Sequence, residues 1–288
     1  MSGVTRFLFE ALDIRGAFVR LSDCWQELLA GRAYGATESG LLGEMSAVTA
    51  LIAAQLKQPG RLTFQLRGEG TVSRLVVDCD EQLRLKAMAR AEAGLLPAPV
   101  PRLLGAERGG QLMLSLDLPT ARQPYQSFVP LEGDTVAAIF QHWLEQSEQQ
   151  SAALFTAADS QAAACLFLQK LPDADTRDPD GWTRVTQLAA TVKPEELRTL
   201  EAHALLSRLF HEEIEHGGGI RIFEARPVSR APANREKVAD TLLALGRPAV
   251  DAILEEHGIV HIRDDLCNRD YLFTRQDIEI LFTPSPRQ

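Results

Sequence analysis

The segment that most constrains the fold of this chain runs from Asp264 to Phe273, close to its end. It reads like a zinc knuckle, in which two cysteines three residues apart reach one tetrahedral metal from a tight turn. Here Cys267 is present, but Asp264 stands where the partner thiol is expected, and no other cysteine follows Cys165. A piece of about 55 residues usually needs a metal, a disulfide or a docking partner to fold securely. The C-terminal part of the chain must therefore fold around what looks like a dismantled metal site.

Length and charge exclude several classes of protein. The 288 residues, 45% hydrophobic and 24% charged, suit one large soluble domain or two smaller ones. The net charge of −9 argues against a nucleic-acid partner. Apolar runs such as 50–54 are far shorter than the roughly 20 residues of a membrane helix. Glu10 and Asp13 interrupt any signal-peptide pattern. We expect a cytoplasmic protein that binds neither nucleic acid nor membrane.

The cysteines show no pattern of a disulfide framework. Cys24, Cys79, Cys165 and Cys267 are widely separated, which favours a reducing compartment. We interpret the first three as small buried core residues, because unpaired cysteine is among the most buried residue types.

Hydrophobic periodicity predicts helices and strands that alternate in the first part of the chain. Apolar residues recur at helical spacing over 41–56, whereas 62–66 and 112–118 alternate with period two, as in half-buried strands. Asp134 is the expected N-cap of a further helix, and 165–171 returns to strand character. This interleaving predicts an α+β protein whose N-terminal part is a mixed sheet covered by helices.

A polar, turn-rich segment at 172–181 marks a boundary. Helices are predicted beyond it at 181–192 and 194–210, followed by a break at Gly217–Gly219 and a short strand at 220–224. The end of the chain is predicted to form helices, a tight turn around Cys267 and a last helix, at 235–245, 248–256 and from Thr274.

Catalytic motifs are lacking in the sequence. Gly68-Glu69-Gly70 is followed by no Lys-Ser or Lys-Thr, so it is no phosphate loop, and no Gly-x-Ser-x-Gly elbow occurs. His211 and His216 flank two glutamates as in a zincin helix, but five residues place them about 140° apart on a helix. They cannot both face one metal, and we expect no enzyme.

Two interpretations of the C-terminal metal-competent residues stay open. His257, His261, Asp264 and Cys267 could gather four ligands around zinc. Structural zinc sites usually hold two or more thiolates, however, which favours surface residues around a turn.

The order and spacing of several motifs resemble the 33 kDa chaperonin family, the bacterial redox-regulated heat-shock holdases, over essentially the whole chain. The motifs that carry this resemblance are Arg6-Phe7-Leu8-Phe9-Glu10, Ile14-Arg15-Gly16, 62–70, Tyr125-Gln126-Ser127, 129–135, 209–213 and Tyr271-Leu272-Phe273.

The resemblance implies three parts: an N-terminal chaperone domain over 1–175, a helical linker over 176–228, and a small C-terminal redox domain over 229–288. Members of the family bind unfolding client proteins without ATP and usually dimerise when active. Clients are expected on apolar surface of the N-terminal domain and linker. A zinc ion bound by four cysteines keeps members inactive until oxidation expels it.

The cysteine positions of this switch fall mostly on residues that cannot bind metal. The Cys-x-Cys pair falls on Ala231 and Ala233, and the first thiol of the second pair falls on Asp264, so that only Cys267 is retained. We predict that the chain binds no zinc here and is not switched on by an intramolecular disulfide. Apolar residues at 242–254 and 272–281 lead us to expect a folded C-terminal domain nevertheless.

Two functions are compatible with this pattern. One is a holdase that keeps client binding and the family's role in the stress response but has no redox switch; the other is an interaction or regulatory protein that binds one specific partner. Cys267 could be a lone redox sensor, but Asp264, Asp265 and Asp270 would raise the pKa of its thiol, which favours a relic.

Overall fold

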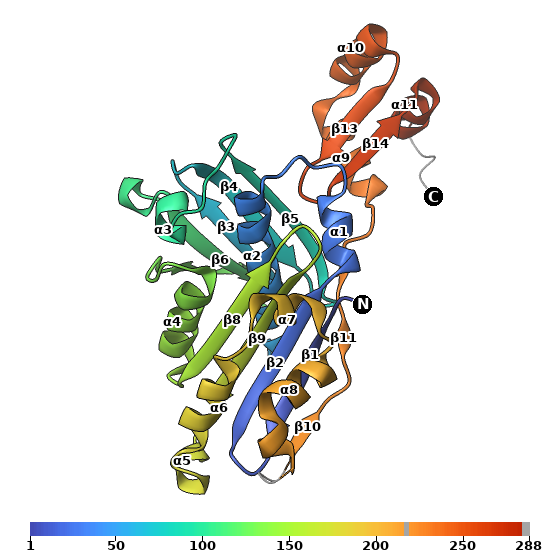
Figure 1. The fold of residues 1–288 in the computed structure, drawn as a ribbon. Coiled ribbons are helices and arrows are strands. Elements are labelled where there is room, and N and C mark those ends of the chain that lie inside the picture. The colour runs from blue at the N-terminus through green and yellow to red at the C-terminus, as the bar shows by residue number, and fades with distance from the viewer. Residues whose placement is uncertain (216–218, 284–288) are drawn as a thin grey trace. The chain divides into compact units, whose positions relative to one another are not determined.

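The computed structural model describes residues 1–215 and 219–283, and its strands and helices confirm the α+β class (Figure 1). The chain divides into two compact units, Met1–Arg230 and Ala231–Gln288. The helices that follow the polar segment at 172–181 belong to the first unit, where they share a core with the N-terminal strands.

The first unit contains two sheets rather than a single one. In the described residues, sheet A has the order β10-β1-β2-β9-β8, with β11 also paired to β1, and all its pairs are antiparallel. Its strands are β1 (Gly3–Phe9), β2 (Ile14–Leu21), β8 (Ala152–Ala158), β9 (Ala163–Lys170), β10 (Ile220–Ile222) and β11 (Arg226–Pro227).

Sheet B has the order β12-β5-β4-β3-β6-β7, and only the β12–β5 pair is parallel among its described strands. Its strands are β3 (Arg61–Arg67), β4 (Val72–Cys79), β5 (Arg84–Ala91), β6 (Gln111–Asp117), β7 (Tyr125–Val129) and β12 (Ser229–Arg230). The strands predicted at 62–66 and 112–118 are β3 and β6, so the period-two pattern located both.

Helix α2 (Ala36–Gln55) contacts strands of both sheets and is buried on nearly every side. This burial explains why its apolar residues are not confined to one stripe, since an all-round apolar helix belongs in a core. Gly43 allows the close approach, because a Cβ there would lie 2.6 Å from the Cβ of Ala158. Three short helices also lie in this unit, at α1 (Asp23–Leu29), α3 (Val100–Leu103) and η1 (Ala106–Arg108).

Helix α4 (Val136–Glu148) packs Phe140 and Trp143 against Phe64 of sheet B. The predicted N-cap was wrong by one residue: Thr135, not Asp134, caps α4, and its side chain accepts a hydrogen bond from the Ala138 amide at 3.1 Å. Thr135 has the extended backbone that lets its hydroxyl reach this amide.

The opposite face of sheet A is covered by α5 (Ala174–Arg177), α6 (Gly181–Ala189), α7 (Pro194–Thr199) and α8 (Ala202–Glu215). The helix predicted over 194–210 is two helices, because the backbone becomes extended at Leu200 and ends α7. The break predicted at Gly217–Gly219 falls largely outside the described residues.

The second unit holds α9 (Arg235–Leu245), α10 (Arg247–His257), the antiparallel hairpin of β13 (Val260–Asp264) and β14 (Arg269–Phe273), and α11 (Arg275–Phe282). Thr274 and Asp277 form a capping box at the start of α11. The sequence predicted a helix from Thr274, and α11 begins at the next residue. A small apolar core joins these elements, formed by Val238, Leu242, Val250, Leu254, Val260, Tyr271, Phe273 and Ile278.

Candidate functional site

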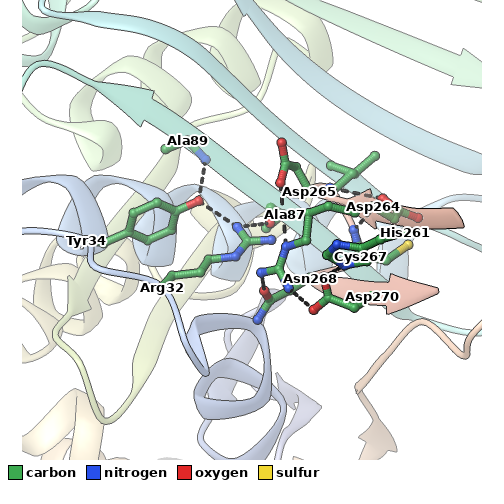
Figure 2. A network of polar contacts seen from close by, with 12 residues as sticks. Arg32, Tyr34, Ala87, Ala89, His261, Asp264, Asp265, Cys267, Asn268 and Asp270 are labelled. Atoms are coloured by element: carbon green, nitrogen blue, oxygen red, sulfur yellow. Dashed lines mark hydrogen bonds and ion pairs between the residues drawn. The ribbon is translucent and has the colours of Figure 1, made fainter. Parts of the chain in front are cut away.

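The turn between β13 and β14 includes Asp264 and Cys267, the two residues of the knuckle-like segment. Asp264 ends β13, and its Oδ1 accepts hydrogen bonds from the backbone amides of Leu266 at 3.1 Å and Cys267 at 3.0 Å (Figure 2). Asn268 takes a left-handed backbone with φ of 53°, a conformation that asparagine tolerates better than most residues. The carboxylate therefore holds the turn closed through the chain's own amides.

Three side chains of the hairpin, His261, Arg263 and Asp270, form hydrogen bonds and ion pairs with one another. His261 Nε2 lies 2.7 Å from Asp270 Oδ1, and Arg263 contacts the other oxygen of the same carboxylate (Figure 2). The hydrogen bond from His261 is the main reason why the pKa of Asp270 is lowered. These side chains pair with one another on the exposed side of the hairpin.

The segment that carries Ala231 and Ala233 lies against the hairpin. Arg269 Nη2 donates to the carbonyl oxygen of Ala231 at 3.1 Å, and the Tyr271 hydroxyl accepts from the amide of Asn234 at 2.9 Å. Ala231 is buried and Ala233 is exposed. The structure thus brings the Ala231 segment and the Asp264 turn together through Arg269, the strand partner of Asp264.

The residues of this region do not fit a zinc ion. Ala231 and Ala233 offer only methyl groups, and the Asp264 carboxylate is already bonded to backbone amides. His257, from the alternative ligand set, has a side chain 60% exposed and lies beside Glu256. Over residues 1–215 and 219–283, no three His, Cys, Asp or Glu side chains are grouped so that they could hold a metal. Zinc binding is tested only by metal analysis, and its absence stays a prediction.

The cysteines outside the turn are buried thiols. Burial raises the pKa of Cys24 to about 12 and raises that of Cys79 and Cys165 still further. A thiol with such a pKa supplies almost no thiolate near neutral pH, so these three residues are inert in the folded state. Cys267 is buried as well, and all four cysteines are thiols rather than disulfides.

A second candidate site is the apolar face of sheet A beneath α6–α8. Phe7 and Phe9 of β1 meet Phe210 of α8 in ring contacts, with the Phe9 and Phe210 centroids 5.0 Å apart. The full buried set is Phe7, Phe9, Leu12, Ile14, Phe18, Ala153, Ala157, Ala164, Leu166, Leu168, Ala174, Val185, Ala189, Leu197, Leu205, Leu206, Leu209 and Phe210.

Ion pairs join α6 to α8 and to the segment before α6. Arg184 of α6 donates to Glu213 of α8 and, at 2.9 Å, to Asp178. The Glu213 side chain is only 6% exposed, whereas Arg184 is 41% exposed. The hydrogen bond from Arg184 is the main cause of the lowered pKa of Asp178. The sequence placed Glu213 in a zincin-like pattern and in the family motif at 209–213; in the structure it is an ion-pair partner of Arg184.

The fold of the chain is similar to that of a solved structure. The fold matches the crystal structure of 33 kDa chaperonin from Thermotoga maritima with a TM-score of 0.75, covering 98% of each chain at 20% sequence identity. At this identity the match shows the fold alone.

Sequence relatives then identify the family. A family model described as Hsp33 protein matches residues 2–274. The 33 kDa chaperonin of Chromobacterium violaceum is 40% identical, covering 96% of this chain and 92% of its own, and that of Methylobacillus flagellatus is 37% identical, covering 96% and 93%. The chain belongs to the Hsp33 family, as its motifs predicted. The family's members are chaperones and not enzymes, which confirms the expectation that this chain is no enzyme.

The helices of the described residues include none long and apolar enough to cross a membrane. Neither the Arg184–Glu213 pair nor the contact between Arg269 and Ala231 could be predicted from the sequence, because each joins residues far apart in the chain.

Proposed function

We propose that this chain is an ATP-independent holdase that binds unfolding proteins, prevents their aggregation and has lost the zinc and disulfide switch. Family membership supports the chaperone role. The loss of the switch is supported by the residues at its four positions, Ala231, Ala233, Asp264 and Cys267. One thiol can close no intramolecular disulfide at these positions, and two alanines and one carboxylate leave no zinc site.

The observation that carries this proposal is the bonding of Asp264 to the amides of Leu266 and Cys267. A metal in such a small unit supplies folding energy by holding its ligands together. Here the carboxylate closes the turn, and the apolar core around Val250 and Ile278 supplies the burial. The second unit therefore has a source of folding energy that does not depend on oxidation state.

The apolar face beneath α6–α8 supplies a client surface on this proposal. Its four phenylalanines, Phe7, Phe9, Phe18 and Phe210, are buried in the closed layer. Heat that loosens the layer would uncover them and let them bind apolar segments of unfolding proteins. We propose activity without an oxidant, in a homodimer and in the cytoplasm, with Cys267 as a relic.

An aggregation assay tests the proposal directly. Purified protein is mixed with a thermally unfolding enzyme, and light scattering is recorded with reductant and chelator, and again after peroxide treatment. We expect equal suppression of aggregation in all conditions, and the same from the variant Cys267→Ser. A strict requirement for peroxide would contradict the loss of the switch. So would one zinc per chain in metal analysis that disappears in Cys267→Ser.

The alternative is an interaction or regulatory protein that binds one specific partner. The proteins that co-purify with the chain from stressed cells distinguish it from the holdase. The holdase predicts a broad mixture of unfolded proteins. A single stoichiometric partner, together with no suppression of aggregation, would favour the alternative.

A further inference from the structure

An apolar trough lies in the first unit on the α2 side of sheet A. A cleft of about 520 Å³ lies between the end of α2, the end of α4 and strands of both sheets. A second hollow of about 310 Å³ is also lined by Arg15, Gln55 and Phe167, so the two hollows adjoin each other. We call this combined space the α2 trough. Its apolar wall includes Leu62, Leu114, Leu116, Leu118, Trp143 and Phe167.

The α2 trough is separate from the face beneath α6–α8. Ala17 and Phe167, which are strand partners, point into the core that contains α2. Their neighbours Phe18 and Leu166 point into the opposite core beneath α6–α8. Arg15 and Gln169 lie two residues from Ala17 and Phe167 on the same strands, so they share the α2 side.

Three cations line the trough, although the chain carries a net charge of −9. Arg6 lies over the ring of Phe223, 5.7 Å from its centroid, while Arg15 donates to the amide oxygen of Gln169. Within the ranges that the structure describes, neither arginine nor Lys57 has a carboxylate within ion-pair distance. The acidic residue on the lining is Glu148. An anion entering the trough would therefore meet an excess of positive charge.

Arg15 is held ready for such an anion. Its Nε lies 2.6 Å from Gln169 Oε1, and Gln169 is only 2% exposed. The two residues are cross-strand partners on β2 and β9, which fixes the guanidinium plane. Because Nε makes this bond, the two Nη groups are left to form a fork that matches a carboxylate.

We propose that the α2 trough binds a long-chain carboxylate of the fatty-acid type. The carboxylate lies on Arg15, Lys57 adds positive charge to the same lining, and the hydrocarbon tail lies along the leucines and Trp143. Small-molecule sites have volumes of about 300–1,000 Å³, mostly apolar walls and few polar groups that orient the ligand, as this trough has. The site goes beyond the proposed holdase activity and does not depend on it.

Calorimetric titration of the full chain tests this site with three probes that share one tail. Decanoate, 1-decanol and decyltrimethylammonium are titrated below their micelle concentrations. We expect decanoate to bind once per chain, decanol more weakly, and the cationic probe not measurably. Arg15→Gln should weaken decanoate about tenfold or more, as for the loss of a charge-assisted pair, and leave decanol unchanged.

Matched variants distinguish recognition of the carboxylate from nonspecific hydrophobic binding. Arg74→Gln removes an exposed arginine of β4 that lies outside the trough, and it should leave decanoate binding unchanged. Leu118→Asp places a charge on the apolar wall and should weaken both decanoate and decanol. Far-UV circular dichroism and a thermal melt verify the fold of each variant, and Lys57→Gln replaces Arg15→Gln if that variant fails to fold.

Several results would overturn the proposal. Equal binding of all three probes, many weak decanoate sites per chain, or no effect of Arg15→Gln would each do so. A fourth titration uses an extended peptide with apolar residues and one glutamate. If Arg15→Gln weakens this peptide while decanoate does not bind, the trough is a polypeptide site and not a fatty-acid site.

Discussion

Asp264 shows how one side chain can hold a tight turn through the chain's own backbone amides. In a knuckle the first ligand position must hold a tight turn in place, and a metal does so by gathering the side chains. The Asp264 carboxylate reaches the amides of Leu266 and Cys267 instead, as aspartate does in many turns. The carboxylate thus closes the turn without a metal ligand at this position.

Replacing Asp264 by alanine should destabilise the hairpin by about 1 kcal/mol, a typical value for the loss of a capping side chain. Two backbone amides would lose their acceptor, so hydrogen exchange across β13 and β14 should become faster. Asp264→Asn keeps an acceptor oxygen and serves as the matched control, with most of the protection retained. Equal exchange in Asp264→Ala and the unaltered protein would show that the carboxylate does not hold the turn.

Glu44 is a second residue whose environment has a measurable consequence. It lies on α2, where burial raises the pKa of its carboxyl group, and the hydroxyl of Thr156 donates to it at 2.7 Å. A raised pKa in the folded state means that folding favours the protonated form. This stabilising contribution is complete below the unfolded-state pKa and is lost as pH rises through the folded-state pKa.

Glu44→Gln should therefore stabilise the first unit relative to the unaltered chain, and the difference should grow as the pH rises from the unfolded-state pKa of the carboxyl group to its raised folded-state pKa. Urea unfolding at a series of pH values measures this difference. Glu107→Gln, at an exposed position, is the control and should show no such trend. A difference that shrinks with rising pH would mean that the buried carboxylate is stabilised in its charged form.

At the scale of elements, sheet A is protected in two ways. The edge strand β8 is covered by α4, whose Gln141 and Glu145 accept hydrogen bonds from the amides of Leu154 and Ala152. These two side chains are one helical turn apart and occupy edge groups that could otherwise pair with another strand. The face of the sheet is covered by α6–α8, which the Arg184–Glu213 pair joins at one edge.

Arg184→Met tests whether the ion pair between Arg184 and Glu213 holds α6 and α8 on the sheet. It keeps most of the side-chain length but leaves the Glu213 carboxylate, 6% exposed, without its charged partner. We expect a cost of about 2 kcal/mol, because a sheltered carboxylate loses a hydrogen bond to a charged donor. Hydrogen exchange over α6 and α8 should accelerate, and under the holdase proposal the temperature at which aggregation is first suppressed should fall.

The control for this variant is Arg247→Met, which breaks the half-exposed pair between Arg247 and Asp251 on α10. Pairs of this kind contribute only a few tenths of a kcal/mol, so exchange over α6 and α8 should not change. Arg184→Met could also leave both the hydrogen exchange of α6 and α8 and the onset temperature of aggregation suppression unaltered. In that case the Arg184–Glu213 ion pair does not determine how firmly these helices cover the sheet.

At the scale of the whole molecule, the two units rely on different sources of stability. The first unit contains α2 between two sheets and a second core under α6–α8, so it buries many large side chains. The second unit has only a small core, and the local bonds of Asp264, Arg269 and Thr274 matter correspondingly more. Small units depend on such additions because they bury less surface per residue.

The sequence by itself determined the elements with clear periodicity. Strands β3 and β6, the helix that became α2, and the helices of the last part of the chain all follow from patterns over neighbouring residues. The motifs also determined the family, and the residues Ala231, Ala233 and Asp264 are visible without any structure. These features could be predicted because each depends on residues that are close together in the chain.

Only the tertiary structure decided which distant residues meet. The division of the strands into two sheets depends on pairing between segments such as β2 and β9, which lie far apart in the chain. The same holds for Arg184 with Glu213, Arg15 with Gln169, and Arg269 with Ala231. Local periodicity tells which side of a strand is apolar, but not which surface will cover it. That choice is made by the packing of the whole chain.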